Sequence, residues 1–243
     1  MMYLSGMERR RWKRLLLWML SFSVIIVISA CINSAGPPRK IDFDAVWFDY
    51  RIWGEEGNDS VTVMLQFHTD GPYGPTIRIE PGGTLTFDGQ KMQVDTNSLN
   101  GPIYQVTKHI RTFTGKHSIV YIDVDKKKFR EDFSYKPFTL VTKIPDTISR
   151  KRFSFDFSGL DTEDYVRVLM TDTSFTSEGI NRLDTLMNNR AIITREDLKA
   201  LENGPIQLEF IREREKLIER DGWETGTILI TYSLKREFFL KDE

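Results

Sequence analysis

The sequence is poor in the residue types that most often carry chemistry. It has one cysteine and three histidines, His68, His109 and His117, among 243 residues. One cysteine excludes an internal disulfide, and a metal site needs clustered Cys, His or carboxylate ligands. A hairpin through residues 114–115 would bring His109 and His117 close together, but the sequence offers this pair no third ligand. We therefore predict neither a bound metal nor a cofactor.

The chain also lacks an excess of either charge. It carries 34 Lys and Arg against 35 Asp and Glu, a net charge of −1. A nucleic-acid-binding protein needs clustered basic charge, so no nucleic-acid partner is expected. The sequence has no Gly-x-Ser-x-Gly elbow, which would indicate a catalytic serine. With 40% hydrophobic residues it has enough apolar side chain for a core. We expect a folded protein that is not an enzyme.

Long apolar runs are absent except for one, at residues 15–30. Its 16 residues fall short of the roughly 20 that span a bilayer core as a helix. A basic cluster at residues 9–14 precedes the run, and the run ends in the small residues Ser29 and Ala30. This order predicts a secretory signal peptide over residues 1–30 that is cut off. The alternative is a permanent single-pass signal anchor with an incidental cysteine.

The only cysteine stands directly after this run, in Ile28-Ser29-Ala30-Cys31. The segment resembles the lipobox of bacterial lipoproteins, with Ile28 where the family most often has Leu. The resemblance implies cleavage between Ala30 and Cys31 and a lipid anchor, including palmitate, on Cys31. Stable anchoring takes more than one acyl chain, and mature lipoproteins typically carry three.

The residues after the cysteine predict where the anchored protein lies. In Gram-negative lipoproteins an Asp after the cysteine commonly retains the protein at the inner membrane. Here that residue is Ile32, so the resemblance implies the outer membrane. Residues 32–40, INSAGPPRK, are polar, small and rich in proline, which is typical of a solvated tether. We predict a lipidated tether over residues 31–40.

The remaining chain predicts an all-β fold. Removing 30 residues leaves 213, with 29 basic and 34 acidic side chains and a net charge of −5. Short segments that alternate polar and apolar residues recur with turn signals every 8 to 12 residues, which is typical of a β-sandwich. The pattern restarts after Pro145, so we predict one β-sandwich over residues 41–144 and a second over 145–243. The second contains one short helix, 195–202, with a capping box at Thr194 and Asp197.

Two segments support a resemblance at the level of the whole chain. They are GTLTFDGQ at residues 83–90 and AIITREDLKALENGP at 191–205, followed by a strand at 206–212. With the signal, tether and Pro-Asp junction, they resemble uncharacterised Ig-like envelope lipoproteins of Bacteroidetes and other Gram-negative bacteria. The resemblance implies two tandem Ig-like β-sandwiches displayed from a lipid anchor. It implies no reaction.

Aromatic side chains crowd the first predicted strand. Trp47 and Trp53 alternate onto one face, and Tyr73 follows in a Gly-Pro-Tyr-Gly-Pro loop. Phe48 and Tyr50 lie on the opposite face. Only one face of a strand can contact the core of a two-layer sandwich, so the rings on the other face need a different role. They pack against the neighbouring domain, stack on a glycan, or anchor another envelope protein.

Two acidic residues form a candidate catalytic pair. Asp123 and Asp125 share one face of a predicted strand, about 7 Å apart, a spacing that a hydrolase uses for an acid and a base. The other interpretation is a solvated strand end. The charged segment 212–216 is predicted to be a solvated edge strand.

The leading hypothesis is a lipid-anchored, non-catalytic binding or assembly module of the envelope. Glycan capture and hydrolysis by Asp123 and Asp125 are the alternatives.

Overall fold

A computed structural model describes residues 46–96, 99–161, 164–174, 177–186 and 188–242. The predicted signal peptide, its cleavage site at Ala30 and Cys31, and the tether lie outside the described residues. Strands account for most of the described chain, and α2 (Ile110–Phe113) and α3 (Arg195–Lys199) are short helices. The predicted all-β class is therefore confirmed. Among the described residues, no helix is long and apolar enough to cross a membrane.

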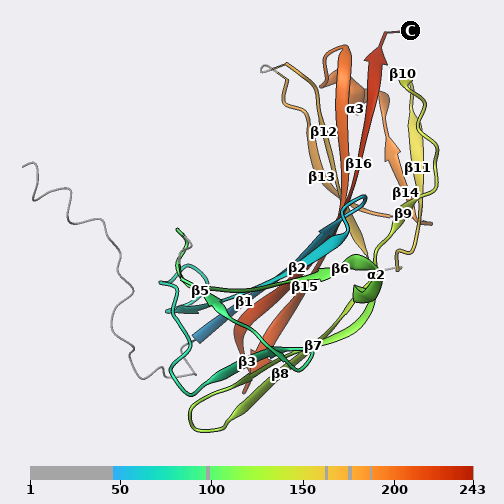
Figure 1. Cartoon of the computed structure of the whole chain (residues 1–243). Helices are drawn as coiled ribbons and strands as arrows, with labels where there is room; N and C mark the ends of the chain where they lie inside the picture. The colour runs from blue at the N-terminus through green and yellow to red at the C-terminus, as the bar shows by residue number, and fades with distance from the viewer. Residues whose placement is uncertain (1–45, 97–98, 162–163, 175–176, 187, 243) are drawn as a thin grey trace, which may run out of the picture. The chain divides into compact units, whose positions relative to one another are not determined.

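Figure 1 shows the strands and their arrangement. In chain order they are β1 (Val46–Glu55), β2 (Ser60–Thr69), β3 (Thr84–Phe87), β4 (Gln90–Lys91), β5 (Val94–Asp95), β6 (Ile103–His109), β7 (Gly115–Ile122), β8 (Lys128–Tyr135), β9 (Thr139–Leu140), β10 (Thr147–Ser149), β11 (Phe153–Ser158), β12 (Tyr165–Thr171), β13 (Ile180–Thr185), β14 (Arg190–Ile193), β15 (Gly204–Arg220) and β16 (Trp223–Lys241).

One large sheet runs through the described chain and two smaller sheets cover it. The large sheet has nine strands in the order β13-β12-β15-β16-β1-β2-β6-β5, with β10 added beside β16. The small sheets are β4-β3-β7-β8 and β14-β11-β9. Each forms a two-layer sandwich with part of the large sheet, which agrees with the prediction of two β-sandwiches.

Aromatic contacts between the layers show where the core lies. In the first sandwich the ring centroids of Phe67 on β2 and Tyr121 on β7 are 5.8 Å apart. In the second, Phe155 on β11 lies 4.9 Å from Phe210 on β15. Edge-to-face and offset ring pairs at such distances add to the free energy gained from burial alone. The cores are thus formed by the inward residues of alternating strands, as the sequence pattern predicts.

The long hairpin of β15 and β16 belongs to both sandwiches. β16 pairs with β1 from Gly226 to Ser233 and with β10 only near its end, at residues 239–241. β15 pairs with β12 over residues 207–213, and the rest of it continues into the first sandwich. Only one short strand, at 206–212, was predicted within this hairpin. The boundary at 144/145 stays a prediction. The hairpin follows this boundary in the sequence but contributes strands to both sandwiches.

One local prediction is corrected. The helix predicted over 195–202 ends at Lys199, and Arg150 donates to the carbonyl oxygen of Leu201 just beyond it, at 2.9 Å. Its predicted capping box at Thr194 and Asp197 is confirmed. Strand β6 ends at His109, whose Nδ1 accepts a hydrogen bond from Arg111 and caps the one-turn helix α2.

Candidate binding surface

Strand β1 separates its side chains onto two faces with different surroundings. Phe48, Tyr50 and Ile52 are at most 1% exposed and form the core of the first sandwich. The residues between them point outward, and Trp53 is 40% exposed. The predicted alternation is therefore present, and Trp53 does not pack into either sandwich core.

The second tryptophan lies at the other end of the same outward face. Trp47 is half-buried and pairs across the strands with His68 of β2. Six residues separate Trp47 from Trp53, about 20 Å along a strand. Among the described residues, neither ring makes an aromatic contact. The structure places both on one face, as predicted, without bringing the rings together.

An ion pair fills the space between the two tryptophans. The Arg51 guanidinium donates to both carboxylate oxygens of Asp49, at 2.8 to 3.1 Å. This hydrogen bonding raises the pKa of Arg51 above its usual value. His68 Nε2 lies 4.0 Å from Asp49 Oδ2. The strand face is thus polar at its centre and aromatic at its two ends.

Tyr73 is held away from the sheet by its loop. The backbone N–H of Gly74 donates to the Gly71 carbonyl at 3.1 Å, and the Gly74 carbonyl lies 3.0 Å from His68 Nδ1. Asp70 and Gly71 have φ values of 62° and 94°, which turn the chain sharply. The Tyr73 side chain is fully exposed. It is available for contact, but no ring contact joins it to another described residue.

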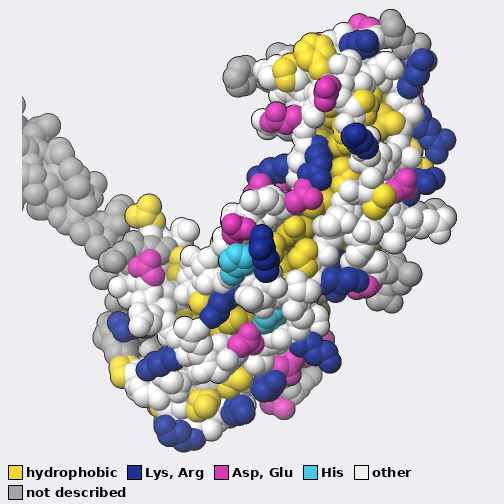
Figure 2. Space-filling model, turned by 45° about the vertical axis from the view of Figure 1, so that its right-hand side comes forward, with side chains coloured by type: hydrophobic (Ala, Val, Ile, Leu, Met, Phe, Trp, Pro, Cys, Tyr) yellow, Lys and Arg dark blue, Asp and Glu magenta, His cyan; other side chains and the backbone are white. Residues whose placement is uncertain are grey.

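The outward face of the large sheet is wider than the sequence indicated. Tyr165 on β12, Leu183 on β13 and Leu217 on β15 are 44 to 48% exposed, and all three lie on this face. Figure 2 shows hydrophobic side chains that reach the surface in groups among charged side chains of both signs. Alternation within each segment marks these residues as outward-facing. The strand order that brings them together depends on long-range pairing, which the local pattern does not contain.

The carboxylates considered for a hydrolase do not share a strand face. β7 ends at Ile122, and Asp123 begins the turn to β8. Asp123 is 3% exposed, and its Oδ1 accepts the backbone N–H of Lys127 at 2.8 Å. Asp125 is exposed on the same turn. The predicted strand geometry is wrong here because the buried carboxylate is used to hold the turn.

The histidines make hydrogen bonds with the protein itself. His117 lies 2.7 Å from Asp88 Oδ2 through Nδ1 and 2.5 Å from the Phe113 carbonyl through Nε2. Its ring stacks on Phe113 with centroids 4.0 Å apart. His109 caps α2. Among the described residues, no group of three or more His, Cys, Asp or Glu is placed to hold a metal ion.

The charged segment 212–216 differs from its prediction. Arg212 is fully buried on the inward face of β15, and its Nη1 lies 3.9 Å from the buried Asp164 carboxylate. Burial lowers the pKa of Arg212, although the charge of Asp164 opposes the shift. Glu215 and Lys216 are exposed, as predicted. Alternation therefore continues through the segment and places one of its charges inside.

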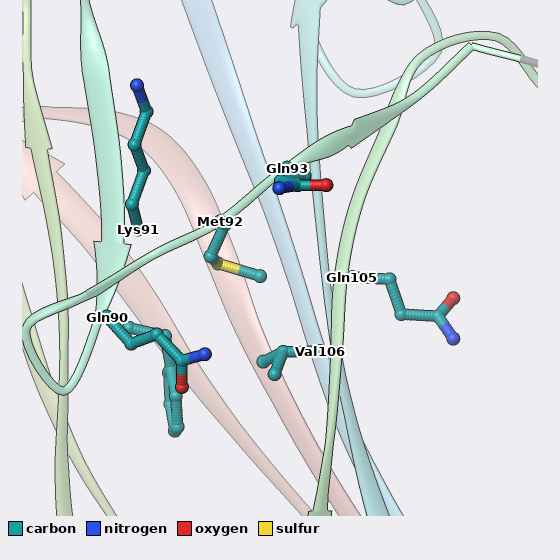
Figure 3. A pocket seen from close by; sticks show the side chains of 7 residues that line it. Gln90, Lys91, Met92, Gln93, Gln105 and Val106 are labelled. Carbon is teal, nitrogen blue, oxygen red and sulfur yellow. The ribbon is translucent and has the colours of Figure 1, made fainter.

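A small cavity lies at an open side of the first sandwich, between β4 and β6. It has a volume of about 220 Å³. Its wall consists of apolar and amide side chains together with one lysine: Phe87, Gln90, Lys91, Met92, Gln93, Gln105 and Val106. Met92 and Val106 point toward each other, whereas Gln105 points away on the far side of its strand (Figure 3). Lys108 donates to the Gln90 amide oxygen, which occupies part of the polar wall.

Comparison with known proteins identifies no family for this chain. No family model and no curated protein matches it. It resembles the IG1+IG2 structure of DIP-gamma at 7% identity and a TM-score of 0.23, over 77% of this chain and 94% of that one. It also resembles Bacteroides ovatus SGBP-B of a mixed-linkage glucan utilization locus, a structure solved with a mixed-linkage heptasaccharide. The identity is 13% and the TM-score 0.21, over 79% of this chain and 61% of that one. Murine CEACAM1b is similar at 13% identity and a TM-score of 0.21, over 81% of this chain and 100% of that one. No ligand or partner of this chain follows from values this low.

Proposed function

We propose that this chain is a lipid-anchored protein of the bacterial cell envelope that binds another envelope component without catalysing a reaction. The observation that carries the proposal is the outward face of the nine-stranded sheet, where Trp53 and Tyr165 are 40 and 47% exposed. Tryptophan and tyrosine dominate the binding energy of protein interfaces. A sheet that crosses both sandwiches presents such residues on one continuous hydrogen-bonded support.

The anchor belongs to the same proposal and rests on Ile28-Ser29-Ala30-Cys31. Lipid on Cys31 would hold the chain at a membrane surface, and Ile32 favours the outer membrane. We expect the protein made in a bacterial host to begin at Cys31 and to incorporate labelled palmitate. The Cys31→Ala variant should lose the label and leave the membrane fraction. An unlabelled chain that keeps residues 1–30 would refute the anchor.

Capture of a glycan is the second candidate, and the full exposure of Tyr73 favours it. Aromatic rings stack on the apolar faces of sugars, and Trp47, Trp53 and Tyr73 would supply them. Because about 20 Å separates the two tryptophans, the ligand would have to be a chain of several sugars rather than one.

A direct binding experiment separates the two candidates. Wild type and Trp53→Ala would be titrated with soluble envelope polysaccharides in isothermal calorimetry. Phe239→Ala is a matched control, because Phe239 is 48% exposed on the same strand system but far from Trp53. A polysaccharide affinity lost only in Trp53→Ala supports glycan capture. An affinity that Trp53→Ala retains would contradict glycan capture through Trp53, and no affinity in any of the three proteins would leave binding of another envelope component.

A further inference from the structure

The most exposed large apolar side chains among the described residues belong to loops and a turn. Tyr73 and Leu99 are fully exposed, and Trp223, at the turn between β15 and β16, is 77% exposed. On the outward face of the large sheet, Trp53 and Tyr165 are less exposed, at 40 and 47%. Apolar side chains that are scattered singly over a surface need no explanation, whereas several gathered at one place indicate a partner.

Strand pairing gathers these three side chains at one end of the large sheet. The last residue of β2 pairs with the first of β1, and the loop that carries Tyr73 follows directly. β16 runs parallel to β1, and their pairing begins three residues after Trp223. The carbonyl oxygen of Asn100, next to Leu99, accepts a hydrogen bond from Gln66 near the same end of β2, at 3.2 Å. The strands β16, β1, β2 and β6 are consecutive in the sheet, so their ends span about 15 Å (Figure 1).

The small sheet β4-β3-β7-β8 adds a basic turn at this end. Residues 123–127 join β7 to β8, and the ring of Phe129 just after them lies 6.3 Å from that of Phe48 near the start of β1. Three consecutive exposed lysines, residues 126–128, lie on this turn and at the start of β8. We name this end of the first sandwich the entry end, because the chain enters β1 there. It comprises the loop 70–75, residues 99–102, the turn 123–128 and residues 221–224.

The entry end has no strong excess of either charge. The three lysines are opposed by four exposed acidic residues: Asp70, Asp125, Asp221 and Glu224. Attraction to an anionic surface would therefore be weak, and contact through this end depends on its apolar side chains. Tryptophan and tyrosine are enriched where a protein meets the headgroup region of a bilayer. Lysine suits the same region, because its stem lies along apolar surface while its ammonium group stays in water or at a phosphate.

The position of the anchor in the sequence brings a bilayer to this end. Cys31 precedes Val46, the first residue of β1, by 15 residues. Fifteen residues reach at most about 50 Å in any conformation. A bilayer that holds lipid on Cys31 is therefore always within this distance of the entry end. A signal anchor that kept residues 15–30 would attach the chain at the same end.

From these observations we infer that the entry end docks on the bilayer that holds the anchor. Tyr73, Leu99 and Trp223 lie in the headgroup region, and the three lysines lie at lipid phosphates. The inference rests on the proposed function, since the anchor supplies the bilayer. Docking directs the strands of the first sandwich away from the membrane and leaves the outward face with Trp53 free for a partner. It also withdraws Tyr73 from glycan capture.

Fluorescence in reconstituted vesicles tests the inference on the anchored chain. Cys31 is the only cysteine, so after its lipidation the new thiol of Tyr73→Cys can be labelled alone with the environment-sensitive dye NBD. The protein would be placed in vesicles of phosphatidylethanolamine and phosphatidylglycerol, with and without a doxyl-labelled lipid. We expect blue-shifted NBD emission that the doxyl lipid quenches. Phe239→Cys is the matched control, because Phe239 is 48% exposed but lies about 50 Å from Trp223 along β16. Its label should be neither shifted nor quenched.

A second substitution ties the docking to the apolar side chains. In the labelled Tyr73→Cys protein, Trp223→Ser should lower the ratio of docked to undocked chains about tenfold, because it removes one large apolar side chain from the contact. Phe239→Ser in the same protein should leave the quenching unchanged. Both side chains are exposed, and unchanged circular dichroism and melting temperature would show that the fold is intact.

The remaining outcomes separate failure of docking from failure of the anchor. If the chain floats with the vesicles but the label at position 73 emits as in water, docking is overturned and the anchor stands. A blue shift that the doxyl lipid does not quench would mean that a second copy covers the entry end, which also overturns docking. Equal effects of Trp223→Ser and Phe239→Ser would contradict the assigned contact. A chain that carries no palmitate and does not float with the vesicles would overturn the anchor, and with it the proposed function.

Discussion

Gly54 on β1 shows at the scale of one residue why the first sandwich packs closely. A Cβ atom added at Gly54 would lie 2.2 Å from the hydroxyl oxygen of Tyr135 and 3.2 Å from Val61. The Tyr135 hydroxyl is buried, and no described residue makes a hydrogen bond with it. Gly54 therefore leaves space for the Tyr135 hydroxyl. This hydroxyl contributes little to the free energy of folding, because no hydrogen bond to a described residue offsets its burial.

Substitution at this contact is our first prediction. We expect Gly54→Ala to lower the free energy of unfolding by about 1–3 kcal/mol, because the new methyl group overfills the core. Tyr135→Phe removes the obstructing oxygen and should change stability by less than about 1 kcal/mol. In the Tyr135→Phe background, Gly54→Ala should cost clearly less than in the wild type. Urea denaturation of the four proteins measures the coupling, and additive effects would contradict the contact.

Single residues also show how far sequence reasoning reaches. The shared strand face of Trp47 and Trp53 and the capping box of Asp197 follow from spacing alone, and both were predicted. The burial of Arg212 was not, because a run of charges indicates a solvated segment when its neighbours in space are unknown. The sequence left a turning strand end and a catalytic pair as two interpretations of Asp123 and Asp125, and the turn is present, but the burial of Asp123 was not predicted.

At the scale of one element, α3 depends on the Asp197 carboxylate, which contacts both the backbone of Thr194 and the guanidinium of Arg182. Asp197 accepts the backbone N–H of Thr194 at 2.7 Å and lies 2.5 Å from the Arg182 guanidinium. Burial on its own would raise the pKa of Asp197, but the hydrogen bonds from Thr194 and Arg182 lower it below its usual value. The folded protein therefore favours the ionised form.

The direction of this pKa shift gives our second prediction. The contribution of Asp197 is complete above the usual pKa of an aspartate, about 3.9, and is lost as the pH falls through the lower value in the folded state. We expect Asp197→Asn to cost about 1 kcal/mol at pH 7. It should also lose less stability than the wild type between about pH 4 and pH 2. Urea unfolding across this range tests both expectations.

The matched control for this prediction lies one residue earlier. Glu196 is in the same first turn, but its carboxylate is exposed and contacts Lys199. We expect Glu196→Gln to keep the wild-type urea midpoint at pH 7. If Glu196→Gln and Asp197→Asn behaved alike, the capping role assigned to Asp197 would be contradicted.

The elements also show which parts of the fold local patterns can predict. Asp221-Gly222 is a dipeptide typical of hairpin turns, and both residues have positive φ, 51° and 83°. The length of β15 was underestimated, because charged residues interrupt the apolar pattern on its outward face. The parallel pairing of β1 with β16 joins residues nearly 180 positions apart, and no local signal indicates it.

At the scale of the whole molecule, that pairing makes the two sandwiches depend on each other. A chain of residues 41–144 alone would lack β16, the partner of β1 in the middle of the large sheet. The backbone of Gly226 lies close to Phe48, where an added Cβ would meet the Phe48 carbonyl oxygen at 2.3 Å. We infer that the free energy of folding of the first sandwich includes pairing with the C-terminal hairpin.

Our last prediction follows from this dependence. Phe155→Leu reduces a buried contact with Phe210 in the second sandwich and should cost roughly 1–3 kcal/mol. Because β15 and β16 belong to both sandwiches, we expect the protein to melt in one transition that moves as a whole to lower temperature. Hydrogen exchange of β2, in the first sandwich, should accelerate together with that of β12. Calorimetry would show equal calorimetric and van't Hoff enthalpies. Two separate melting transitions in Phe155→Leu, with β2 exchange unchanged, would mean that the sandwiches fold independently and that the hairpin joins them without coupling them.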